Sequence, residues 1–210
     1  MSKLLGTVAE IWVFPVKSML GGRVDRAQVG IRGVDGDRTW AVAGPDGELV
    51  TAAEEPRLRE VTPTWAAAGL AALRLPDGTE VTPEGAGAAL STLLGREVRL
   101  VRAEGDGGGF VDVAPVHVVS RGGLAQAASP EHASTCTTCD VREPRANLVL
   151  ELEADGDAER ALVGATVRVG ATELRVVRHP DHCLGVYAEV VTPGALAVGD
   201  EVLLAVPAAP

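Results

Sequence analysis

The chain has 210 residues, enough for one large domain or two small ones. Hydrophobic residues make up 46% and charged residues 23%, a globular balance that excludes a disordered or fibrous chain. The net charge of −10 repels phosphate backbones and anionic lipids, and aromatic residues are only 3%, so we expect neither a nucleic-acid nor a membrane partner.

Targeting and redox signals are weak in this sequence. No apolar run approaches the roughly 18 residues of a membrane span. Glu10 and Pro15 interrupt the apolar start, which is unlike a signal peptide, and we therefore expect a cytoplasmic protein. Three cysteines are too few for a disulfide framework, and their odd number leaves at least one thiol free.

The first hundred residues predict β structure. A β-branched run over Gly6–Phe14 predicts a strand that Pro15 ends, and Arg23–Ile31 predicts a second strand. Proline and glycine in two short turns favour hairpins, because proline fixes φ and glycine tolerates positive φ. The remaining predictions here are hairpins over 39–51 and 72–82, a helix over 84–94 that Gly95 ends, and a strand over 97–102.

The glycine-rich acidic segment Glu104–Gly109 is the best linker candidate, so we predict domains at 1–104 and 110–207. After it, Val118–Ala128 predicts a helix that two glycines weaken. The pattern as a whole indicates a mainly β (α+β) fold with a barrel-like or sandwich core and a few short helices. The later strands are expected over 147–152, 167–169, 173–178, 186–191 and 201–206.

Cys183 follows a predicted strand and a proline-containing turn, where rigid scaffolds present functional side chains. Arg178, His179 and His182 would lower the pKa of its thiol if they point at the sulfur. A thiolate there can act as a nucleophile, a persulfide carrier or a soft-metal ligand. The alternative is a cysteine that packs as a small hydrophobic residue.

Cys136 and Cys139 form a Cys-Thr-Thr-Cys pair four residues after His132. This spacing suits a redox disulfide or half of a zinc site, whose other ligands would have to come from Cys183 or a histidine. The alternative is a loop pair without a role.

Arginines and other polar residues offer anion sites. Arg142 and Arg145 precede a buried strand, where a guanidinium can bind a phosphate or carboxylate, or simply pair with a neighbouring acid. The same two interpretations hold for Lys17, Ser18 and Arg38.

Several segments in chain order carry a family resemblance. They are Gly6–Val8, Phe14–Ser18, Gly36–Trp40, Val50–Thr51, Glu55–Leu58, Val116–Ser120, Arg142–Asn147, Cys183, Gly185–Tyr187, Pro193–Gly194 and Val198–Asp200. Together they resemble the MOSC family, and most closely its two-domain members with an N-terminal MOSC β-barrel domain, which include the mitochondrial amidoxime-reducing component and its bacterial relatives.

The resemblance implies a β-barrel-like N-terminal domain packed against a C-terminal MOSC β-barrel, with a pterin molybdenum cofactor between them. Cys183 matches the cysteine that ligates molybdenum. A dianionic phosphate needs local cations in a protein that is acidic as a whole, and Lys17, Arg38 and Arg145 could provide them. The positions that match cofactor-holding residues are Lys17, Ser18, Arg38, Ser120, Arg145, Asn147 and Tyr187.

Departures from the family pattern concern the substrate. Pro180 stands where the family often has a second cysteine, and His182 stands where the reductases usually carry arginine. The reductases also insert a long segment between the positions of Cys183 and Tyr187, which this chain lacks. The Cys136–Cys139 pair lies outside the family pattern.

The resemblance implies a molybdenum-dependent reductase of N-hydroxylated or other N- or S-oxygenated small molecules. Its electrons would come from a separate reductase, because the chain has no flavin motif and no cysteine quartet. One alternative is a sulfur-transfer module that carries a persulfide on Cys183, supplied by a cysteine desulfurase. Another is a non-catalytic cofactor carrier, or a binding domain stabilised by zinc at Cys136 and Cys139.

Overall fold

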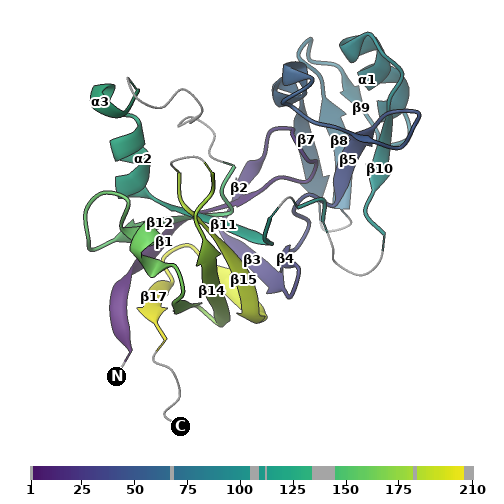
Figure 1. Ribbon diagram of the computed structural model, residues 1–210. Coiled ribbons are helices and arrows are strands. Elements are labelled where there is room, and N and C mark those ends of the chain that lie inside the picture. Colours follow the sequence, from purple (N-terminus) through teal and green to yellow (C-terminus); the bar gives the residue numbers. More distant parts are fainter. Residues whose placement is uncertain are drawn as a thin grey trace. The chain divides into compact units, whose positions relative to one another are not determined.

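The computed structural model describes residues 2–66, 69–104, 109–111, 113–133, 145–181 and 184–205. It is mainly β, as predicted, and contains two compact units (Figure 1). We call residues 1–12, 23–35 and 113–210 the barrel unit, and residues 13–22 and 36–112 the central unit.

The barrel unit contains a closed ring of seven strands, in the order β12-β11-β15-β14-β13-β17-β1, with β1 pairing back to β12. Closure leaves the ring without a free edge. Only β11 and β12 run parallel within it. The strands are β1 (Lys3–Val13), β11 (Val116–Ser120), β12 (Leu148–Leu152), β13 (Thr166–Val169), β14 (Thr172–Arg178), β15 (Val186–Thr192) and β17 (Glu201–Leu204).

This ring explains why the compact units differ from the predicted domain ranges 1–104 and 110–207. Residues 1–12 cluster with residues 113–210 because β1 pairs with β12 on one side and with β17 on the other. Residues 23–35 join the same unit because Arg26–Gly30 (β3) pairs with Gly194–Ala197 (β16). The first strand of the chain therefore belongs to the barrel that the C-terminal strands form.

Alternating side chains build the barrel core. Val118, Leu148 and Leu150 line the interior of the ring and are at most 5% exposed. Their strand neighbours Val119 and Val149 point the other way, into a second apolar cluster. A period of two is what a strand imposes on a sequence that must bury both of its faces.

The predicted helix over Val118–Ala128 is wrong in its first turn. Val116–Ser120 is the fully buried strand β11, and the helix α2 spans only Arg121–Ala127. A short apolar run fits a buried strand as well as a helix, and the β-branched valines favour the strand. Ser120 marks the change, because its hydroxyl accepts a hydrogen bond from the Gly123 N–H as the N-cap of α2.

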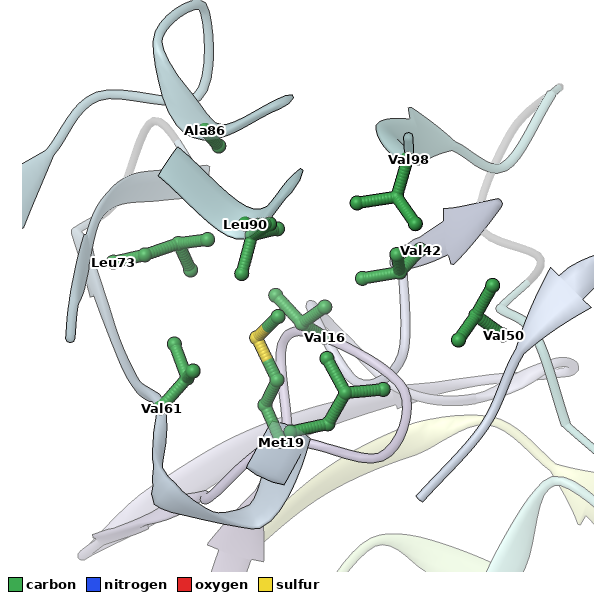
Figure 2. Close-up of a cluster of buried hydrophobic side chains, with 10 residues drawn as sticks. Val16, Met19, Val42, Val50, Val61, Leu73, Ala86, Leu90 and Val98 are labelled. Carbon is green, nitrogen blue, oxygen red and sulfur yellow. The ribbon is translucent and has the colours of Figure 1, made fainter. Parts of the chain in front are cut away.

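The central unit is built around one apolar cluster. Val16 and Met19 are fully buried and lie among the side chains of Val42, Val61 and Leu90 (Figure 2). The unit has two three-stranded sheets, ordered β10-β5-β6 and β7-β8-β9, and the helix α1. Its elements are β5 (Trp40–Ala43), β6 (Leu49–Val50), η1 (Pro56–Glu60), β7 (Thr62–Ala66), β8 (Gly69–Arg74), β9 (Glu80–Val81), α1 (Ala86–Leu94) and β10 (Arg99–Arg102).

The turn predictions in this unit are confirmed. The strands β5 and β6 pair as a hairpin, as do β8 and β9, and Gly95 ends α1 with φ of 67°. In the second hairpin, the Thr79 N–H donates to Asp77 Oδ1 at 2.9 Å, and this bond together with the Thr79 hydroxyl lowers the pKa of the Asp77 carboxyl.

The predicted strand Arg23–Ile31 is interrupted at Asp25, whose carbonyl accepts a hydrogen bond from the Val198 N–H. None of the helices in the described part of the chain is long and apolar enough to cross a membrane. The remaining elements are β2 (Gly22–Val24), β3 (Arg26–Gly30), β4 (Gly33–Val34), α3 (Pro130–Ala133), η2 (Ala158–Leu162) and β16 (Gly194–Ala197).

Candidate functional site

Lys17 and Ser18 occupy the middle of a tight turn in the central unit. The Met19 N–H donates to the Val16 carbonyl at 3.2 Å, and both flanking side chains are anchored in the core (Figure 2). Ser18 has φ of 70°, which the third position of a type II turn requires and which favours glycine. The core therefore holds a serine in a conformation that costs about 1–3 kcal/mol.

Arg38 is held in an equally specific way. It has φ of 50°, and its N–H donates to the Phe14 carbonyl at 2.7 Å. Its guanidinium pairs with the Asp37 carboxylate and lies 5.2 Å from the centre of the Phe14 ring. Asp37 also accepts the Phe14 N–H at 2.8 Å. The side chains of Arg38 and Asp37 are only 14% and 3% exposed, so the cation is fixed within the fold.

The backbone of Phe110 brings Lys17 and Arg38 together. Its N–H donates to the Arg38 carbonyl at 2.8 Å, and its own carbonyl accepts from Lys17 Nζ at 3.2 Å. No motif in the sequence marks Phe110, which follows the predicted linker. Gly109 was the available signal, because a Cβ there would lie 2.6 Å from the Asp37 carbonyl oxygen. Only glycine allows this strand of backbone to pass so close to Asp37.

In the barrel unit, Asn147 links two strands. Its Oδ1 accepts the His117 N–H at 3.1 Å, and its Nδ2 donates to the Trp12 carbonyl at 3.4 Å. Its backbone N–H and carbonyl bond to His117 and Trp12 at 2.8 Å. Asn147 is 1% exposed, so in the structure it is a buried residue that connects His117 and Trp12 by hydrogen bonds. Its role towards a cofactor stays a prediction.

Ser120 has a structural role of the same kind. Its hydroxyl accepts the Gly123 N–H at 2.9 Å and donates to the Gly156 carbonyl at 3.1 Å. The residue is 1% exposed. A hydroxyl has one proton to donate, and the Gly156 carbonyl takes it. Its role in cofactor binding also stays a prediction.

Tyr187 packs against a histidine that we did not single out from the sequence. The ring centres of Tyr187 and His117 are 5.0 Å apart at 42°. His117 is 6% exposed, and its Nε2 lies 3.1 Å from the Leu184 carbonyl oxygen. The sequence presents His117 only as one residue of a strand motif, so nothing in its local pattern marks this contact.

Backbone strain coincides with the predicted site. Among the residues that the structure describes, three residues other than glycine have positive φ, and they are Ser18, Arg38 and Arg145, with φ of 70°, 50° and 52°. All three belong to the seven residues that the family resemblance assigns to the cofactor. Such conformations persist where the surrounding fold enforces them, and they concentrate at binding sites.

The three cysteines lie outside the described residues, as do His182 and Arg142. The predictions for Cys183 as a metal ligand and for Cys136 and Cys139 as a zinc or redox pair therefore stay predictions. Within the described ranges, no group of three or more histidine, cysteine, aspartate or glutamate side chains is arranged to hold a metal ion.

The family model described as the MOSC N-terminal beta barrel domain matches residues 5–113. The chain belongs to this family. This MOSC protein is 40% identical over 83 residues to the mitochondrial amidoxime reducing component 2 of Bos taurus, across 34% of this chain and 25% of that protein. It is 43% identical over 58 residues to the mitochondrial amidoxime-reducing component 1 of Homo sapiens, across 26% of this chain and 17% of that protein.

These matches span a quarter or less of the length of the curated relatives. Among solved structures, the YUAD protein from Bacillus subtilis is similar with a TM-score of 0.47 at 13% identity, over 97% of this chain and 98% of that chain.

The strain at Ser18 predicts that two variants of this residue differ in stability but not in ligand binding. We expect Ser18→Gly to be about 1 kcal/mol more stable than Ser18→Ala, because only glycine relieves the positive φ. Both variants lack the hydroxyl. If Ser18 binds the cofactor as predicted, both should therefore bind an anionic cofactor about 10-fold or more weakly than the wild type, the expected loss for a charge-assisted hydrogen bond. Urea unfolding and pterin content per chain measure the two effects. Equal stability of the two variants would contradict the strain.

Proposed function

We propose that this MOSC protein binds a pterin molybdenum cofactor and reduces N-hydroxylated or other N- or S-oxygenated small molecules. Family membership and the names of its relatives support the cofactor class. The observation that carries the proposal is that Ser18, Arg38 and Arg145, all assigned to the cofactor by resemblance, are the strained non-glycine positions of the described chain.

The described residues fit the anionic end of such a cofactor. The Phe110 carbonyl accepts a hydrogen bond from the Lys17 ammonium, and the Phe110 N–H bonds to the backbone carbonyl of Arg38, so the fold holds both cationic residues before any ligand arrives. Charged donors that the fold already holds in position lose little conformational entropy when they bind a phosphate. In a chain with a net charge of −10, a dianion needs local cations, and the Lys17 ammonium and the Asp37-paired Arg38 guanidinium are such groups.

The donor set also suits the metal. Cys183 would supply the protein thiolate, a soft ligand that matches a metal already bound by sulfur. When bound, the cofactor would accept oxygen from the substrate and supply two electrons. The conversion of N–OH to N–H and water takes two electrons and two protons, so an electron donor must restore these electrons, and we propose a separate reductase for this step. The chain itself would bind the cofactor, orient the substrate and exclude water.

Elemental analysis of protein expressed with molybdate tests this function. We expect about one molybdenum per chain in the wild type, its loss in Cys183→Ser, and its retention in the matched control Cys136→Ser. The loaded protein should then reduce an amidoxime when given a chemical reductant. A wild type without molybdenum, or equal molybdenum in wild type and Cys183→Ser, contradicts the proposal. Zinc that is lost only in Cys136→Ser would favour a zinc-stabilised domain instead.

A further inference from the structure

Leu184 and Gly185, which directly follow Cys183 in the sequence, are tightly held against the barrel. The Leu184 side chain is 2% exposed and belongs to the apolar cluster with Val119 and Val149. Gly185 has φ of 73°, and a Cβ at this position would lie 2.2 Å from the Val118 carbonyl oxygen. The chain therefore passes β11 at a distance that only glycine allows.

His117 provides the polar part of this attachment. Its Nε2 lies 3.1 Å from the Leu184 carbonyl oxygen, and a carbonyl can only accept. The partner thus assigns the proton of the imidazole to Nε2. The same close approach appears at the glycine, since a Cβ on Gly185 would lie 2.9 Å from His117 Nε2.

The His117 side chain, which donates this hydrogen bond, is itself held in place by its neighbours, unlike a side chain that only fills space. Asn147 bonds both the N–H and the carbonyl of His117, at 3.1 Å and 2.8 Å. The Tyr187 ring packs 5.0 Å from the imidazole. His117 is 6% exposed, so water has little access to replace its bond to Leu184. Loss of the donor would remove this hydrogen bond from the Leu184 carbonyl, and this favours a new orientation of the peptide.

We propose that His117 is a positioning residue that fixes the segment following Cys183 to β11 through the Leu184 carbonyl. Its effect on the metal ligand rests on the proposed function of Cys183, whereas the attachment itself does not. Asn147 and Tyr187, which the resemblance assigns to the cofactor, hold the imidazole in place from the backbone and from the ring face. The three residues thus form one support for Leu184 and Gly185, the two residues that follow Cys183 in the sequence.

Two amide substitutions separate the hydrogen bond from the bulk of the side chain. In His117→Gln the amide nitrogen reaches the place of Nε2, whereas in His117→Asn it stops near the place of Nδ1. Hydrogen exchange is followed in metal-free, full-length protein, in the peptide containing Leu184 and Gly185. We expect His117→Asn to raise the exchange rate there at least tenfold, and His117→Gln to stay within about threefold of wild type. The β13–β14 hairpin serves as the internal control.

Equal exchange in His117→Asn and wild type would overturn the inference, and so would equal acceleration in both amide variants. If His117→Asn does not fold, His117→Phe replaces it, because it keeps a ring against Tyr187 and lacks a donor. Molybdenum per chain is then compared after expression with molybdate, with a lower content expected in His117→Asn than in His117→Gln. A wild type that takes up no molybdenum refutes the proposed function alone, since the exchange result stands without metal.

Discussion

Gly6→Ala is expected to lower the free energy of unfolding by more than about 4 kcal/mol, because it prevents closure of the barrel. Gly6 has φ of 153°, and a Cβ there would lie 2.0 Å from the Glu151 carbonyl oxygen and 2.8 Å from the Leu152 Cα. Both are backbone atoms of β12, so no side chain can move to make room. On its other side, Gly6 pairs with Val202 of β17, which prevents β1 from retreating.

Gly164→Ala is the matched control for this prediction. Gly164 lies in the same unit with φ of 89°, but a Cβ there would meet no atom within 4 Å. The control therefore carries only the cost of positive φ, about 1–2 kcal/mol. Urea unfolding measured by circular dichroism compares the two variants. If Gly6→Ala loses no more stability than Gly164→Ala, the close approach of β1 to β12 is refuted.

The same strand shows what the sequence can and cannot predict. The β-branched run from Gly6 marks a strand clearly, and the structure places β1 over Lys3–Val13. Its two partners in the ring are β12 and β17, which begin at Leu148 and Glu201. Nothing local in a strand specifies a partner so distant along the chain, because pairing depends on how whole elements pack. For this reason the compact units differ from the predicted ranges 1–104 and 110–207.

Local ambiguity explains the wrong prediction of a helix from Val118. The run at Val118 and Val119 is too short to show a period, and a following serine and two glycines suit either a weak helix or its start. The structure resolves this with a parallel partner, since β11 pairs with β12 and needs apolar side chains on both faces. The turns around Asp77 and Gly95 were predictable, because each depends on residues within four positions of one another.

At the candidate site, motifs identified residues but not their connections. Resemblance selected Ser18, Arg38 and Arg145, and the structure finds positive φ at each of them. No spacing in the sequence indicates that the peptide of Phe110 lies between Lys17 and Arg38, because this contact joins segments far apart along the chain. The position of His117 in a strand motif likewise does not indicate that it contacts the Leu184 carbonyl, because this contact depends on tertiary packing.

Arg38→Ala is expected to lower the free energy of unfolding by about 3–5 kcal/mol, because it leaves the Asp37 carboxylate buried without its cation. The Asp37 side chain is 3% exposed and would keep the Phe14 N–H among its partners in the described chain. Alanine retains the cost of positive φ at this position, so the loss reports the ion pair and not the strain. Unfolding in urea, followed by tryptophan fluorescence, gives the value.

The double variant with Asp37→Asn completes a thermodynamic cycle for this pair. An asparagine oxygen can still accept the Phe14 N–H but carries no charge, so Asp37→Asn should recover most of the stability that Arg38→Ala loses. Cofactor content should follow the cation instead, staying high in Asp37→Asn and falling in both variants that lack Arg38. Additive losses of stability would show that the two side chains do not interact. Equal cofactor content in Arg38→Ala and wild type would remove Arg38 from the binding site, while leaving its role in the fold intact.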